Sequence, residues 1–164
     1  MNVHAVCETP FFSLRISASE DSLLGVSFTQ DGIGTGENAI TRAAFAQINE
    51  YLAGKRRCFE LPFELSGTDF ELNIWRALPE IPYGATLSYG EIAAKAGSKN
   101  AARAAGAALH KNPLAIILPC HRVIGANGAL TGFAGGIDVK RRLLELEQHF
   151  LKADSSSASA RKGK

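Results

Sequence analysis

Apolar residues follow two different spacings along the first third of the chain. Between 11 and 28 they come in short alternating or clustered runs, which is typical of β-strands. Between 39 and 53 they recur at helical spacing, and Gly54 stands where a helix can end. The pattern therefore predicts a small antiparallel sheet with one helix over residues 1–65.

The next part of the chain, 66–151, is patterned for helices. Two capping boxes, 68–71 and 88–91, pair a hydroxyl residue with a glutamate, which satisfies free N–H groups at the start of a helix. Gly97 interrupts the second of these helices, and a further helix is expected over 98–110, capped by its first residue. Two helices joined by a short glycine-containing turn form a helix-turn-helix unit.

The second helix of this unit consists largely of alanine and glycine between Lys99 and Ala108. The sequence alone leaves two explanations equally open: the helix packs tightly against a neighbour, or it contacts DNA. A helix with ordinary side chains is about 10–12 Å across, whereas the minor groove of DNA is only about 6 Å wide. A helix with small side chains is thinner, so its backbone can come close to a narrow groove.

The composition, with 46% apolar and 21% charged residues, is that of an ordinary globular protein with one or two small cores. We find no signal peptide and no apolar run that could span a membrane, so we expect a cytoplasmic protein. The segment 152–164 is rich in Ser, Ala and Lys, and we expect a disordered tail there. The sequence thus predicts an α+β protein with one unit over 1–65 and a helical unit over 66–151.

Charge is unevenly distributed along the chain, although the net charge is only +2. Residues 1–65 hold five Lys/Arg and eight Asp/Glu, whereas residues 66–164 hold thirteen and eight. The second part is therefore the candidate for binding a polyanion, although a solvated surface is the commoner cause of such a difference.

The three cysteines are odd in number and far apart, which favours reduced thiols over a disulfide framework. No closely spaced ligand pair indicates a metal site. A lone cysteine is usually a small apolar core residue, and this interpretation suits Cys7 and Cys58. Cys120 differs because His121 and Arg122 follow it directly.

A thiol becomes a useful nucleophile at neutral pH only when a base or a positive charge favours the thiolate. His121 is the candidate base for Cys120. Adjacent residues of an extended chain point to opposite faces, so we expect a bridging water between them rather than direct contact. The two residues alone leave open a cysteine hydrolase.

The segment 119–124, Pro-Cys-His-Arg-Val-Ile, matches without a gap the active-site signature of a known family. Further short segments match the pattern of the same family and occur in the same order, at 67–70, 74–78, 81–84, 88–89, 101–103, 112–113 and 135–136. The sequence therefore resembles the O6-alkylguanine-DNA alkyltransferases over nearly the whole chain before the tail. The intact signature argues against the other alternative, a non-catalytic helix-turn-helix DNA-binding protein.

The resemblance implies a ribonuclease H-like fold for the N-terminal unit and a winged helix-turn-helix fold for the C-terminal unit. It implies direct-reversal DNA repair, in which an alkyl group moves irreversibly from O6-alkylguanine in double-stranded DNA to Cys120, once per protein molecule. O4-alkylthymine is a second expected substrate. The resemblance further implies no cofactor, no metal and a monomeric protein, and leaves cooperativity along DNA open.

The resemblance also assigns catalytic roles. Cys120 is the alkyl acceptor, and His121 takes the thiol proton through a water molecule. Glu147, on a helix expected over 140–148, orients His121, because a carboxylate behind an imidazole fixes its tautomer and stabilises its charged form. Without the resemblance, Glu147 is better interpreted as a solvated side chain. Asn112 ties the turn before the active-site segment.

A base inside a duplex must be turned out of the stack before a thiol can reach it. By resemblance, Arg103 fills the space that the base leaves, and Ala102 and Ala104 lie along the minor groove. Arg122 is a further DNA contact. Tyr89 crowds the phosphate and donates a hydrogen bond toward the guanine.

The pocket for the extruded base is assigned to Val123, Phe133, Ala134 and Gly135. Two of these positions depart from the family pattern, since Phe133 stands where a tyrosine is common and Ala134 where a serine donates to O6. The loss of both hydroxyls bears on how strongly the leaving guanine is stabilised and on which alkyl groups fit.

Overall fold

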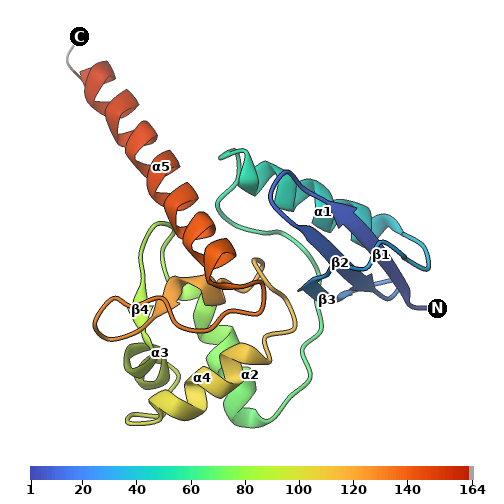
Figure 1. Ribbon diagram of the computed structural model, residues 1–164, viewed down its shortest axis with the longest axis horizontal. Coiled ribbons are helices and arrows are strands. Elements are labelled where there is room, and N and C mark those ends of the chain that lie inside the picture. The colour runs from blue at the N-terminus through green and yellow to red at the C-terminus, as the bar shows by residue number, and fades with distance from the viewer. Residues whose placement is uncertain (163–164) are drawn as a thin grey trace.

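The N-terminal unit is a three-stranded antiparallel sheet covered by one helix. The computed structural model describes residues 1–162. The elements of this unit are β1 (Val3–Glu8), β2 (Ser13–Ala18), β3 (Leu23–Phe28) and α1 (Ala39–Leu52), with the sheet order β1-β2-β3. Figure 1 shows α1 lying along the sheet, and α1 contacts all three strands. The prediction of a small antiparallel sheet with one helix is confirmed.

The core of this unit forms where the apolar face of the sheet packs against the apolar face of α1. Leu14 and Ile16, two residues apart on β2, are fully buried on the same face of the sheet. Ile48 and Tyr51, three residues apart on α1, are also fully buried and share one face of that helix. Tyr51 therefore lies in the core near the C-terminal end of α1.

The C-terminal unit is built from helices and two very short strands. Its elements are α2 (Asp69–Ala77), η1 (Leu78–Glu80), β4 (Leu87–Ser88), α3 (Tyr89–Lys95), α4 (Ala102–His110), η2 (Cys120–Arg122), β5 (Val123–Ile124) and α5 (Ile137–Lys162). Both predicted capping boxes are present, at the starts of α2 and α3. Helices α2, α3 and α4 pack on one another, and Trp75 Nε1 donates to the carbonyl of Ala108 at 2.8 Å. The predicted α+β class is confirmed.

Helix α4 begins later than the sequence predicted. Ser98 does not cap it, because Gly97 has a φ of 87° and the N–H of Ser98 donates to the carbonyl of Ala93, which closes α3. Asn100 also has a positive φ, 68°, and α4 starts only at Ala102. The turn of the helix-turn-helix unit is therefore longer than expected.

The segment before Cys120 lies against the N-terminal sheet. The N–H of Val26 donates to the carbonyl of Pro113 at 2.8 Å, and the N–H of Ala115 donates back to the carbonyl of Val26 at 3.0 Å. All residues of 114–118 are buried. The two units therefore share one hydrophobic core, and β3 supports the chain that leads to Cys120.

The last helix, α5, is longer than predicted, and Figure 1 shows it (red) extending beyond the rest of the molecule. The sequence predicted a helix over 140–148 and a disordered tail over 152–164, whereas α5 runs from Ile137 to Lys162. The physical reason is that the tail contains good helix formers, Ala, Lys and Arg, and no Gly or Pro before residue 163. Residues 163–164 lie outside the described part. None of the described helices is both long and apolar enough to cross a membrane.

Candidate active site

Cys120 begins the short helix η2 at the end of a buried segment, and only 8% of its surface is exposed. Asn112 ties the turn before it. The Nδ2 of Asn112 donates to the carbonyl of Leu118 at 3.0 Å, and its Oδ1 accepts from the N–H of Leu114 at 3.0 Å. The N–H of Cys120 donates to the same Leu118 carbonyl at 2.7 Å. The position of the thiol is therefore set by backbone and amide hydrogen bonds on both sides of the segment.

The thiol of Cys120 is protonated at neutral pH. Burial raises its pKa above the ordinary value, and a hydrogen bond from the Asn112 side chain and the positive charge of Lys140 only partly oppose that effect. A buried thiol with a raised pKa needs a base before it can attack.

His121 is fully buried and has one ring nitrogen without a partner. Its Nε2 lies 2.7 Å from Oε2 of Glu147, whereas Nδ1 has no hydrogen-bond partner in the described part of the chain. Burial lowers the pKa of His121 and outweighs the opposite effect of Glu147, so the imidazole is neutral. Since an ionised carboxylate accepts the Nε2 proton, Nδ1 is left as an acceptor. A neutral imidazole with a free Nδ1 can act as a general base.

The backbone at Cys120 and His121 differs from the extended chain that the sequence suggested. Both residues lie in the 3₁₀ turn η2. Successive side chains of a 3₁₀ turn point about 120° apart, so they still diverge. A bridging water between the thiol and the imidazole therefore stays a prediction.

Glu147 is completely buried at the centre of a cluster of hydrogen-bond donors. Its carboxylate accepts from Nε of Arg122 at 2.9 Å, from the N–H of Gly84 at 2.9 Å and from the hydroxyl of Tyr51 at 2.6 Å, besides His121. Burial alone raises the pKa of Glu147, but the hydrogen bonds from His121 and Arg122 and the positive charge of Arg122 outweigh it and lower the pKa to about 2. Glu147 is therefore a fixed anion.

The assignment of Arg122 to the DNA contacts needs correction. Arg122 is 6% exposed, and its guanidinium donates to both carboxylate oxygens of Glu147 and to the carbonyl of Ile81 at 2.8 Å. These groups occupy the donors that a phosphate would need. Arg122 is a buried counter-ion of Glu147.

The thiol opens into a pocket formed by α4, the loop 131–135 and the end of β3. The pocket is lined by Phe28, Tyr89, Gly106, Leu109, His110, Asn112, Ala115, Cys120, Gly132, Phe133, Ala134 and Lys140. Phe133 and Ala134 thus lie in the same pocket as the thiol. Gly135 instead lines an adjoining hollow, and Val123 is fully buried and is not among the residues that line the pocket.

Two polar side chains hold the pocket loop. The Nζ of Lys140 donates to the carbonyl of Val123 at 2.6 Å and to the carbonyl of Thr131 at 3.0 Å. The hydroxyl of Tyr89 lies 2.8 Å from Oγ1 of Thr131. Tyr89 therefore stands in the pocket, although its hydroxyl is bound to the loop.

The outer face of α4 carries the residues that were assigned to DNA. Arg103 and Ala104 are exposed and Ala102 is half-buried. Gly106, three residues after Arg103, lines the pocket, so Arg103 lies one helical turn from the pocket wall. A long exposed cation among small residues can enter a groove without steric obstruction from its neighbours.

Three polar residues of the pocket and of the hydrogen-bond cluster around Glu147 were not predicted from the sequence: Lys140, His110 and Tyr51. Lys140 and Glu147 lie seven residues apart on the buried face of α5, and this spacing of two charged residues along one helix face was the available signal. His110 directly precedes the Asn112 turn. Tyr51 carried no signal, because its helical spacing with Ile48 is that of an ordinary core residue.

Two family models described as 6-O-methylguanine DNA methyltransferase match the chain, the ribonuclease-like domain over 2–65 and the DNA binding domain over 69–149. A methylated-DNA--protein-cysteine methyltransferase of Methanosarcina acetivorans is 43% identical over 152 residues, which cover 88% of this chain and 97% of the relative.

Solved structures from Mycobacterium tuberculosis are also similar. The crystal structure of its O6-methylguanine methyltransferase has a TM-score of 0.83 at 42% identity and covers 91% of this chain and 94% of that chain. A structure of the M. tuberculosis protein in complex with DNA has a TM-score of 0.82 at 43% identity. It covers 90% of this chain and 93% of that chain.

Proposed function

Because this chain belongs to the 6-O-methylguanine DNA methyltransferase family, we propose that Cys120 is its alkyl acceptor in the direct-reversal repair of O6-alkylguanine. One observation carries the assignment: Cys120 opens into a pocket and is followed directly by a buried neutral histidine. Cys7 is half-buried and Cys58 is exposed, and neither lines this pocket.

The first step is the loss of the thiol proton. Nδ1 of His121 accepts the proton of Cys120 through a bridging water, and the imidazole becomes positively charged. Glu147 stabilises this charge through the 2.7 Å contact with Nε2. Because the pKa of Glu147 is about 2, the carboxylate stays ionised and His121 keeps both its orientation and its tautomer.

The second step is an in-line displacement at the alkyl carbon. The thiolate lone pair of Cys120 forms the new S–C bond, and the electrons of the breaking C–O6 bond pass to the guanine, which takes up a proton. The product is a thioether. A thioether has no carbonyl for water to attack, so Cys120 stays alkylated and each molecule reacts once.

The leaving guanine meets few hydroxyl groups in this pocket. Phe133 and Ala134 provide none, and the Tyr89 hydroxyl remains as a candidate donor once it releases Thr131. Preorganised donors at the leaving group lower the barrier of such a reaction. We therefore assign leaving-group stabilisation to Tyr89.

The base reaches the pocket from the side of α4. Ala102 and Ala104 let the helix approach the minor groove of double-stranded DNA, and Arg103 fills the space that the extruded nucleotide leaves. The walls of α4 and the loop 131–135 then hold the base above Cys120.

Transfer of a labelled methyl group tests the assignment. Duplex DNA with labelled O6-methylguanine is incubated with the protein, with Cys120→Ser and, as matched control, with Cys58→Ser. We expect at most one label per molecule, on the peptide that contains Cys120, in the wild type and in Cys58→Ser, and none in Cys120→Ser. Label on another residue, or more than one transfer per molecule, contradicts the assignment. Repeated turnover of an acyl substrate would point to the cysteine hydrolase instead.

A further inference from the structure

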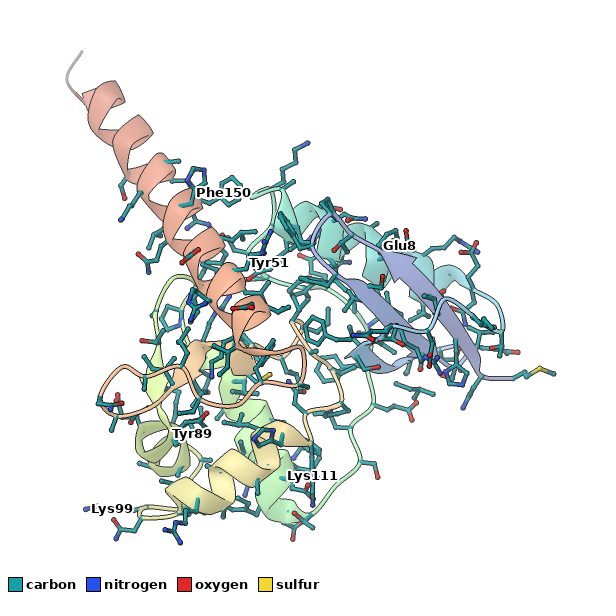
Figure 2. The ribbon with its side chains drawn as sticks, viewed as in Figure 1. Glu8, Tyr51, Tyr89, Lys99, Lys111 and Phe150 are labelled. Atoms are coloured by element: carbon teal, nitrogen blue, oxygen red, sulfur yellow. The ribbon has the colours of Figure 1, made fainter. Side chains whose placement is uncertain are left out.

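Tyr51 brings a hydroxyl from the N-terminal unit to the buried His121–Glu147 pair. Figure 2 shows Tyr51 between α1 and the start of α5. Its hydroxyl donates to Oε2 of Glu147 at 2.6 Å and lies 3.3 Å from Nε2 of His121. The side chain is fully buried, so no solvent competes for these contacts.

The hydroxyl of Tyr51 contacts the same carboxylate oxygen that accepts from His121. Burial, together with the negative charge of Glu147, raises the pKa of Tyr51 well above its ordinary value. The phenol therefore stays protonated and can only donate to the carboxylate. Each further hydrogen bond that Oε2 accepts reduces the negative charge that can stabilise a protonated His121.

We propose that Tyr51 is a positioning residue of the transfer reaction, which sets the basicity of His121 through its hydrogen bond to Oε2 of Glu147. The proposal rests on the proposed function, in which His121 is the base for Cys120. By drawing charge from Oε2, the Tyr51 hydroxyl weakens the stabilisation of the imidazolium and keeps His121 neutral in mildly acidic solution. It also holds the carboxylate so that Nε2 stays occupied and Nδ1 stays free.

The proposal gives the N-terminal unit a direct part in the chemistry. Tyr51 lies within 1–65, whereas Cys120, His121 and Glu147 all lie within 66–151. Tyr51 makes its contact across the interface where α1 meets α5. The site is therefore completed by a residue outside the unit that carries the nucleophile.

The variant Tyr51→Phe removes only the hydroxyl, and Tyr83→Phe is its matched control. The ring of Tyr83 packs edge-on against Tyr51 with centroids 6.2 Å apart, and its hydroxyl has no hydrogen-bond partner among the described residues. Both substitutions thus delete a buried hydroxyl at the same cluster, but only the first removes a donor to Glu147.

The test is the pH dependence of single-turnover methyl transfer at saturating protein, with thermal unfolding measured alongside. In Tyr51→Phe we expect the acid limb to move to higher pH by about 0.5–1 unit, which is about a three- to tenfold lower rate on that limb, with the plateau within about twofold. Tyr83→Phe should follow the wild-type curve.

An unmoved acid limb in Tyr51→Phe overturns the proposal, as does a uniform loss of rate that parallels a lower unfolding temperature. An equal shift in Tyr83→Phe also overturns it, because that hydroxyl makes no contact with Glu147. Failure of the proposed function is distinguishable, since the wild-type protein would then carry no label on Cys120.

Discussion

Replacing Glu147 with Gln removes the anion at the centre of the buried cluster and keeps its size. The pKa of Glu147 is about 2, against an ordinary value of 4.5. That difference corresponds to about 3.5 kcal/mol at about 1.4 kcal/mol per unit. The variant also leaves Arg122 as a buried charge without a counter-ion, a change that typically costs about 3–5 kcal/mol. We expect the free energy of unfolding at pH 7 to fall by about 3.5 kcal/mol.

The pH dependence of this loss has a definite sign. A carboxyl whose pKa is lower in the folded state stabilises the fold fully above pH 4.5 and loses that contribution as the pH falls toward 2. The wild type therefore loses stability over this range. Glu147→Gln has no carboxylate to protonate, so its free energy of unfolding lacks this pH-dependent contribution. The difference between the two proteins should shrink as the pH decreases.

Urea unfolding at pH 7, 4 and 3 measures the difference directly. The matched control is Glu145→Gln, an exposed glutamate on the same helix, which should unfold like the wild type. The transfer rate of Glu147→Gln should also fall, because His121 loses the group that stabilises its charged form, while the affinity for DNA stays nearly unchanged. A stability difference below about 1 kcal/mol at pH 7, or one that does not change with pH, refutes the reasoning about the buried anion.

Two further variants test the pocket and the DNA contact. In Arg103→Ala we expect transfer from duplex DNA to slow by about one to two orders of magnitude at saturating protein, while transfer from the free base is nearly unchanged, because only the duplex requires base extrusion; equal slowing of both single-turnover rates contradicts this role. In Ala134→Ser we expect transfer to become about two- to tenfold faster, because the new hydroxyl can donate to the leaving guanine; an unchanged rate on methylated duplex DNA means that the hydroxyl does not reach O6.

Local patterns were sufficient to predict the regular elements. The apolar spacing over 39–53 and the capping boxes at 68–71 and 88–91 depend on residues a few positions apart, and all three helices are present. The later start of α4 was missed because Ser98 serves the end of α3 instead. Local competition between two helix ends is not visible in a capping pattern.

The candidate site was less predictable because its parts come from distant segments. The signature around Cys120 was recognisable as a motif, but the burial of Glu147 depends on Tyr51, Gly84 and Arg122, which lie far from it in sequence. An isolated glutamate on a helix is usually solvated, and the spacing from Lys140, seven residues earlier on the same helix face, was a weak sign of its burial. Arg122 was misassigned for the same reason, since its partner lies 25 residues away.

The hydrogen bond between Tyr51 and Glu147 joins residues 96 positions apart, and this separation bears on how the protein matures. Cys120 leaves the ribosome before Glu147, so the nascent chain carries the thiol while His121 still lacks its orienting carboxylate. The contact closes a long loop, whose entropic cost is met only when α1 and α5 dock. We therefore expect the Cys120 thiol to become reactive only when the last helix is in place.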